Sequence, residues 1–217
     1  MKMNHYISVL NNSKTEYIVE KSKFIAHIKP VFTEEEAIEF INDVKKEHRK
    51  ANHNVPVYSI KDKIQKYSDD GEPSKTAGFP VLEMLKNENI TNIVIVITRY
   101  FGGIKLGKGG LIRAYTKSAK LGLENSKLIK YVKVMRTVLT YEYTLHGKIE
   151  NFILKESDVH EANTEFLENV KKEIYVPIEK VDSLEKALVE LTNNAIRIEQ
   201  IDTEFVVVDG DKLIVQT

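Results

Sequence analysis

NIVIVITRYFGGIKLGKGGLIRAYTKSAK, residues 92–120, is the stretch that decides the fold of the first half of the chain. Its apolar run Ile93–Ile97 is typical of a buried β-strand. After a glycine-rich loop, residues 110–126 have the amphipathic pattern of a helix. A strand, such a loop and a helix can together build an anion site from backbone N–H groups. The glycines are Gly102, Gly103, Gly107, Gly109 and Gly110.

Cations accumulate on this loop and helix. Between Arg99 and Lys127 there are seven Lys and Arg but one acid, Glu124. Helical spacing would bring Arg113, Lys117 and Lys120 to one face, where they could bind phosphates. Alternatively, the glycines shape a turn and the cations are a solvated face. The candidate anion-binding residues are Arg99, Gly102, Gly103, Lys105, Gly107, Lys108, Gly109, Gly110, Arg113, Lys117 and Lys120, with Lys21, Lys23, His53, Asp69, Asp70 and Glu72 as supporting residues.

The segment from Gly102 to Lys108 matches the phosphate-loop pattern G-x-x-x-x-G-K. The next residue is Gly109, so the Ser or Thr hydroxyl that would hold Mg²⁺ is missing. The pattern therefore disfavours a nucleotide-triphosphate site. It leaves open an anion-binding surface for a nucleic-acid backbone or another phosphate.

Composition narrows the class of protein. The absence of cysteine excludes disulfides, cysteine nucleophiles and thiolate metal sites. The apolar runs are too short to span a bilayer, and the N-terminus lacks the features of a signal peptide; we therefore expect a cytoplasmic protein without membrane contact.

The two halves of the chain carry opposite net charge. Residues 1–128 hold 21 Lys and Arg against 15 acids, and residues 129–217 hold 11 against 17, so the halves carry +6 and −6. This asymmetry suggests an anionic partner for the first half, or attraction between two domains. The oligomeric state stays open.

The elements around the glycine-rich loop follow from local patterns. Residues 15–32 are expected to be extended, and a helix is expected after Thr33, whose hydroxyl and Glu36 form a capping box. Residues 54–61 predict a strand that Pro56 places at an edge or a bulge. A short helix is expected over residues 79–87.

The second half has a different pattern. Strands are expected over residues 131–143, 159–167, 170–178 and 197–208, and helices over residues 145–157 and 182–194. A turn at Asp209-Gly210 leads into a last short strand. The order βαββαβ is that of a ferredoxin-like domain. We therefore expect an α+β protein of two domains, residues 1–130 and 131–217.

An acidic loop and a histidine offer a different kind of site. Asp69, Asp70 and Glu72 could bind a divalent cation, but their spacing matches no standard calcium loop, and a structural role is favoured. His53 precedes a strand and could act as a general base. No metal or cofactor is expected. Because of these residues, an alternative function remains: an enzyme that acts on a phosphorylated small molecule in a cleft beside the glycine-rich loop.

Several blocks together resemble the IMPACT/YigZ family. They are KSKFI (21–25), ANHN (51–54), DDGEPSKTAG (69–78), TRYFGGIKLG (98–107) and GGLIRAY (109–115). The resemblance covers the first domain, and the second is similar to the additional C-terminal domain of bacterial members. It implies a first domain similar to a ribosomal-protein domain and to domain IV of elongation factor G. It also implies a second domain similar to the last domain of that factor.

The residues and the resemblance lead to one main hypothesis. We expect a non-enzymatic protein that binds RNA or the ribosome through the basic face of its first domain, linked to translation regulation. The phosphate-cleft enzyme is the first alternative. A regulator that binds a protein partner is the second.

Overall fold

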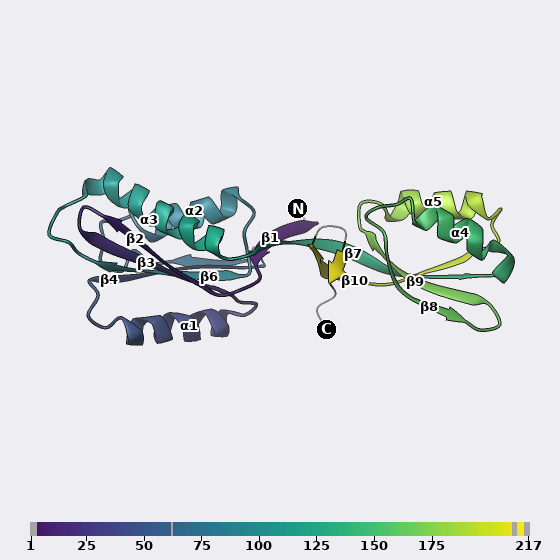
Figure 1. Ribbon diagram of the computed structural model, residues 1–217, viewed down its shortest axis with the longest axis horizontal. Helices are drawn as coiled ribbons and strands as arrows, with labels where there is room; N and C mark the ends of the chain where they lie inside the picture. The colour runs from purple at the N-terminus through teal and green to yellow at the C-terminus, as the bar shows by residue number, and fades with distance from the viewer. Residues whose placement is uncertain (1–3, 62, 210–211, 215–217) are drawn as a thin grey trace. The chain divides into compact units, whose positions relative to one another are not determined.

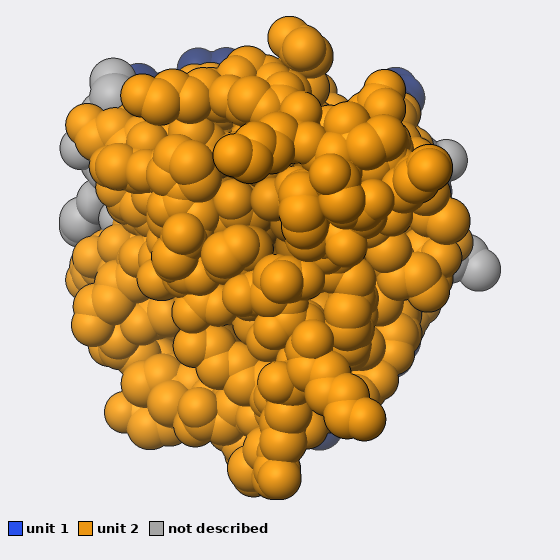
Figure 2. All heavy atoms as spheres, turned by 90° about the vertical axis from the view of Figure 1, so that its left-hand side faces the viewer, with its two compact units in different colours: residues 1–5, 130–217 blue, residues 6–129 orange. Residues whose placement is uncertain are grey.

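The apolar run of residues 93–97 lies at the centre of a five-stranded antiparallel sheet, where every side chain from Ile93 to Ile97 is fully buried. The computed structural model describes residues 4–61, 63–209 and 212–214. The chain divides into an N-terminal unit, Tyr6–Ile129, and a C-terminal unit, Lys130–Thr217 together with Met1–His5. These units are orange and blue in Figure 2. Within the described residues, no helix is long and apolar enough to cross a membrane.

The N-terminal unit has one sheet between two helical layers (Figure 1). Helix α1 (Glu34–Glu47) covers one face; α2 (Gly78–Asn87) and α3 (Gly107–Asn125) cover the other. Each face has its own apolar core, and β6 contributes to both because its side chains alternate. In spatial order the strands are β2 (Ser13–Val19), β3 (Ser22–Pro30), β6 (Ile93–Tyr100), β4 (His53–Ile60) and β5 (Ile64–Tyr67).

The Thr33 cap predicted for α1 is confirmed, while the Glu36 carboxylate bonds to the residue before the cap and not to Thr33 itself. The Thr33 hydroxyl accepts a hydrogen bond from the Glu36 N–H at 3.2 Å, and the Glu36 carboxylate accepts one from the Phe32 N–H at 2.7 Å. A cap of this kind stabilises a helix by about 1 kcal/mol. Ala37, Ile41 and Val44 form the buried stripe.

Two expected elements differ from the structure. The extended segment 15–32 is a β-hairpin, because Glu20 and Lys21 both adopt positive φ and reverse the chain between β2 and β3. The sequence has no Asn-Gly or Asp-Gly at this turn, so the reversal had no local signal. Pro56 lies within β4 just beyond the residues that pair with β5, and its carbonyl accepts a hydrogen bond from the Ser68 N–H. Strand β4 thus lies between β6 and β5 and not at the edge of the sheet, and Pro56 is paired with Val96 of β6.

Helix α3 begins at Gly107, three residues before the predicted start. Glycine is a poor helix former, so the residue types of this first turn pointed to a loop. Tertiary packing holds the helix in place, because Leu111, Ala114 and Tyr115 are buried against the sheet.

The C-terminal unit has the predicted βαββαβ order: β7 (Leu128–Tyr141), α4 (His146–Ile153), β8 (His160–Phe166), β9 (Val170–Pro177), α5 (Val181–Leu191) and β10 (Arg197–Asp209). Its sheet runs β11-β10-β7-β9-β8, with β11 (Lys212–Ile214) at one edge; β1 (His5–Val9) also pairs with β7. Helices α4 and α5 cover one face over a core that includes Leu139, Ile149 and Leu188. Gly210, part of the predicted turn, lies outside the described residues. Two antiparallel sheets and the five α-helices of the described residues are consistent with the expected α+β class.

Candidate functional site

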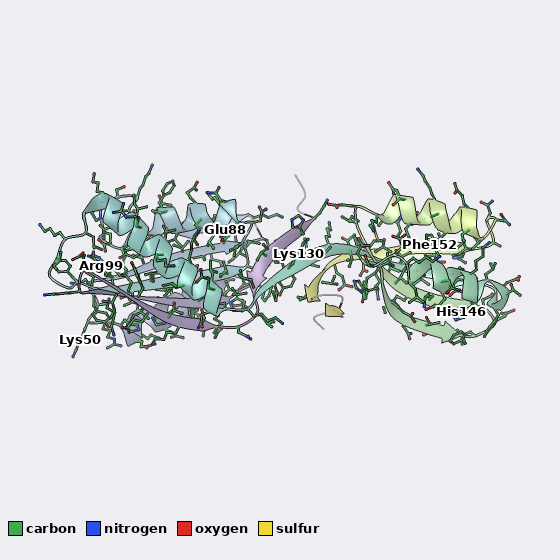
Figure 3. All side chains as sticks on the ribbon, turned by 45° about the horizontal axis from the view of Figure 1, so that its top comes forward. Lys50, Glu88, Arg99, Lys130, His146 and Phe152 are labelled. Carbon is green, nitrogen blue, oxygen red and sulfur yellow. The ribbon has the colours of Figure 1, made fainter. Side chains whose placement is uncertain are left out.

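Arg99 is buried inside the N-terminal unit instead of lying on an open phosphate-binding face. It stands near the end of β6 (Figure 3), opposite Phe24 of β3 and His53 of β4. Its side chain is 7% exposed. The rings of Phe24 and Phe101 lie 5.3 and 5.5 Å from the guanidinium carbon. The expectation that Arg99 makes a surface phosphate contact is therefore corrected: a central strand covered on both faces leaves its side chain little access to solvent.

Glu72 is the ion-pair partner of Arg99. One of its carboxylate oxygens lies 2.7 Å from the Arg99 Nη1 and accepts a second hydrogen bond, also 2.7 Å, from the Tyr115 hydroxyl. Burial, and then the charge of Glu72, raise the pKa of Tyr115 well above its ordinary value of 10.0. Ser22 completes the network, because its hydroxyl accepts from the Arg99 Nη2 at 3.4 Å. We call Ser22, Glu72, Arg99 and Tyr115 the buried charged cluster.

Asp69 and Asp70 organise the backbone. The Asp69 carboxylate accepts hydrogen bonds from the N–H groups of Lys75, Ala77 and Gly78, at 2.7 to 3.1 Å, and so holds the start of α2. The Asp70 carboxylate accepts from the Asn54 N–H at 2.7 Å. This is the structural role that the sequence favoured for the acidic loop.

His53 is oriented by the same loop. Its Nδ1 lies 2.7 Å from the Asp70 carbonyl oxygen, and a carbonyl only accepts, so Nδ1 carries a proton. The other ring nitrogen, Nε2, lies 3.7 Å from the Glu72 carboxylate. The Nε2 atom of His53 therefore faces the buried charged cluster.

The glycines of the loop have different roles. A Cβ on Gly102 would lie 2.0 Å from the Lys21 backbone, so only glycine fits there, and its N–H already donates to the Ser22 hydroxyl at 3.1 Å. Gly102 thus does not offer a free N–H to an anion, contrary to expectation. Gly103 has a positive φ in open space. Gly107, Gly109 and Gly110 belong to the first turn of α3, which has no side-chain cap; such N–H groups lack partners within a helix.

A pocket of about 500 Å³ lies beside this turn, which we call the β6–α3 pocket. It brings together the supporting residues His53 and Glu72 with three predicted cations, as well as the glycine that begins α3. Asp69 and Asp70 do not line it. The lining includes His53, Glu72, Arg99, Lys105, Gly107 and Lys108.

A larger, open groove of about 1070 Å³ runs between β2 and α3, and we call it the α3 groove. Its exposed cations are Lys105, Arg113, Lys117 and Lys120. Of these four cations, only Lys120 forms an ion pair within the described residues. Its ammonium lies 3.5 Å from the carboxylate of Glu88, which follows α2 (Figure 3). Arg99 and Lys108 therefore line the β6–α3 pocket, Arg113, Lys117 and Lys120 line the α3 groove, and Lys105 lines both.

The remaining candidates lie around the β2–β3 turn. Lys21 occupies the turn itself, and Lys23 forms an ion pair of 2.7 Å with Glu16. Sequence reasoning missed Ser22 and Tyr115 as partners of the candidate residues. Both lie within the blocks that carried the family resemblance, but their spacing along the chain does not indicate that they meet Arg99.

Comparisons with known proteins identify the family. The Impact N-terminal domain matches residues 20–123, and the Domain of unknown function (DUF1949) matches residues 139–195. IMPACT family member YvyE of Bacillus subtilis is 45% identical over 195 residues, 88% of each chain. IMPACT family member YigZ of Escherichia coli is 31% identical, over 83% of this chain and 90% of its own. A solved structure of a hypothetical protein aligns with a TM-score of 0.57 at 26% identity, over 92% of this chain and 98% of that one. The chain therefore belongs to the IMPACT family.

Proposed function

We propose that the N-terminal unit binds RNA, free or in the ribosome, through the α3 groove. The observation that carries this proposal is the row of exposed cations along one open groove, of which Lys105, Arg113 and Lys117 have no ion-pair partner among the described residues. Unpaired cations at helical spacing suit a phosphate backbone, because each can neutralise one phosphate and release a counterion. Membership of the IMPACT family supports a regulatory role at the level of the family.

The floor of the groove suits single-stranded nucleic acid. Tyr17 and Val19 of β2 line it, together with Ile104, which is 40% exposed. Aromatic and apolar surfaces beside cations let bases stack without sequence preference. Base stacking on Tyr17 with phosphates along α3 is the arrangement that we propose.

The likeness to elongation factor G belongs to the same proposal. The βαββαβ order of the C-terminal unit supports a ferredoxin-like domain, and the resemblance pairs it with a first domain similar to domain IV of that factor. Two domains of this kind suit a ribosomal ligand in the cytoplasm. We propose the ribosome as the physiological source of the RNA.

Filter binding to a single-stranded RNA over a salt series tests the proposal. Arg113→Glu/Lys117→Glu should weaken binding at least tenfold and lower the salt slope by about 1.4, because each lost phosphate contact removes roughly 0.7. Arg49→Glu/Lys50→Glu is the matched control, since these exposed cations follow α1, on the other side of the sheet. Equal losses in both variants, or no loss in the first, would contradict the α3 groove.

A second candidate function is favoured by the β6–α3 pocket, which would hold a phosphorylated small molecule. The Arg99 Nε is buried without a hydrogen-bond partner among the described residues, and the uncapped first turn of α3 lies beside Lys108. An anion in the pocket would meet the N–H groups of that turn and the Lys108 ammonium, with the Arg99 charge beneath them and the His53 Nε2 nearby as a general base.

Calorimetric titration with inorganic phosphate and a phosphorylated sugar separates the two candidates. If the pocket is the site, Lys108→Gln abolishes the binding heat, whereas Lys117→Gln, in the groove, leaves it unchanged. If neither phosphate compound binds the wild-type protein at millimolar concentration, the second candidate fails and the first is untouched.

A further inference from the structure

A cluster of two histidines and one glutamate lies on the face of the N-terminal unit that α1 covers. His27 belongs to β3, while Glu47 and His48 lie at the end of α1. Ala26 and Ile28 bury their side chains in the core under α2 and α3, so strand alternation turns His27 toward α1. One ligand atom from each of the three lies within 4.8 Å of the others. This cluster shares no residue with the β6–α3 pocket or the α3 groove.

The two imidazoles are buried, and the Nε2 of His27 has no partner among the described residues. His27 is 5% exposed and His48 is 8% exposed. The Nε2 atom of each forms no hydrogen bond with the described residues, and the two ring centroids are 4.9 Å apart. Buried polar atoms are nearly always satisfied. The His48 Nε2 lies 3.3 Å from the Glu47 Oε1, so the unsatisfied His27 Nε2 is a buried nitrogen beside a second imidazole and a carboxylate.

His48 is held in the orientation that a metal ligand needs. Its Nδ1 lies 2.9 Å from the Tyr100 hydroxyl, which leaves Nε2 directed toward the cluster. Its backbone is held as well, since its N–H donates to the Val44 carbonyl and its own carbonyl accepts from the Ala51 N–H. Ligating histidines typically bond through the second ring nitrogen in this way.

We propose that His27, Glu47 and His48 form a binding site for a divalent transition-metal ion of the zinc class. Two imidazole nitrogens and one carboxylate oxygen are a donor set that such ions accept, with a fourth position left for water. Tetrahedral Zn²⁺ holds its ligand atoms about 3.4 Å apart, so the cluster must contract slightly. The Glu47 side chain is 54% exposed and free to make that adjustment.

Lys14 competes for the same carboxylate. Its ammonium lies 2.6 Å from the Glu47 Oε1, and its side chain is 52% exposed. A metal ion would have to displace this ammonium from Glu47. The proposal therefore predicts that removing the Lys14 charge tightens metal binding.

Zn²⁺ titration against a chromogenic chelator, on untagged protein stripped with EDTA, tests the site. We expect one ion per chain for the wild-type protein, and at least a tenfold loss of affinity for His27→Gln and for His48→Gln. His5→Gln, an exposed histidine in the C-terminal unit, is the matched control and should bind like the wild type. Co²⁺ substitution should give the visible absorption bands of a tetrahedral ion.

Two surface variants keep the test decisive if a buried variant fails to fold. Glu47→Gln should weaken Zn²⁺ binding at least tenfold, and Lys14→Met should strengthen it. The site is wrong if both variants bind Zn²⁺ as the wild type does. It is also wrong if His5→Gln loses as much affinity as Glu47→Gln. These measurements need no RNA, so their outcome is independent of the α3 groove.

Discussion

Arg99 and Arg113 lie fourteen positions apart in one basic stretch, yet the structure gives them opposite environments. Arg99 is buried against Glu72 in the buried charged cluster, whereas Arg113 is exposed on the α3 groove without an ion-pair partner among the described residues. Residue type and spacing therefore identify a basic region, but only burial distinguishes a cation that is paired inside the protein from one that is exposed to a ligand.

The physical cause is the position of each element in the layers. Strand β6 is covered by helices on both faces, so a charge near its end must find a partner inside the protein. Helix α3 has one buried stripe and one solvent face, so its cations on the second face need no internal partner. The two regions should therefore respond to mutation in opposite ways.

The largest effect is expected from Arg99→Met. The substitution leaves the Glu72 carboxylate buried without its cation, and we expect it to lower the free energy of unfolding by about 3 to 5 kcal/mol. Urea unfolding followed by circular dichroism measures this loss. Arg99→Met/Glu72→Gln should recover part of it, because the buried charge is gone. A loss below about 1 kcal/mol in the single variant would show that the pair is not structural.

Tyr115 of the same cluster should make the free energy of unfolding depend on pH in the alkaline range. Its pKa is raised in the folded state, whereas the unfolded chain ionises near pH 10, so the unfolded state holds fewer protons above that pH. Stability is thus retained below pH 10 and falls above it, with Tyr115 contributing about 1.4 kcal/mol per pH unit.

Unfolding curves between pH 9.5 and about pH 11.5 measure this slope. Tyr115→Phe should remove its share of the decline, whereas Tyr67→Phe, an exposed tyrosine outside the cluster, should not. The same decline in the wild type and in Tyr115→Phe would contradict the assignment.

The smallest effect on stability is expected for the α3 groove. Arg113→Glu/Lys117→Glu should change the free energy of unfolding by less than about 0.5 kcal/mol, since both side chains are exposed and unpaired. Urea unfolding of this variant, beside its RNA titration, checks that any loss of binding is not a loss of folding. A large destabilisation would remove the contrast between the two regions.

Local patterns predicted the elements well where the signal was local. The Thr33 cap, the buried run of β6 and the βαββαβ order are all present. The β2–β3 turn was missed because Glu20 and Lys21 adopt positive φ without glycine or asparagine. The start of α3 was placed late because glycines rarely begin a helix by propensity alone.

The candidate site was predicted only in part. The structural role that the sequence favoured for Asp69 and Asp70 is present, because both carboxylates accept backbone hydrogen bonds. The sequence could not assign Glu72 to Arg99, because these residues are 27 positions apart and meet through the fold. For the same reason it did not bring His27 and His48 together, since they come from a strand and a helix end.

Most of the elements, the basic character of residues 92–120 and the family could be predicted from the sequence alone, because each depends on neighbouring residues or on motifs in order. Only the tertiary structure decided which charges are buried and which histidines meet. Contacts across a sheet depend on strand order and register, which join distant residues such as Phe24 and Arg99. The same packing that buries Arg99 beside Glu72 leaves Arg113 and Lys117 open to a ligand.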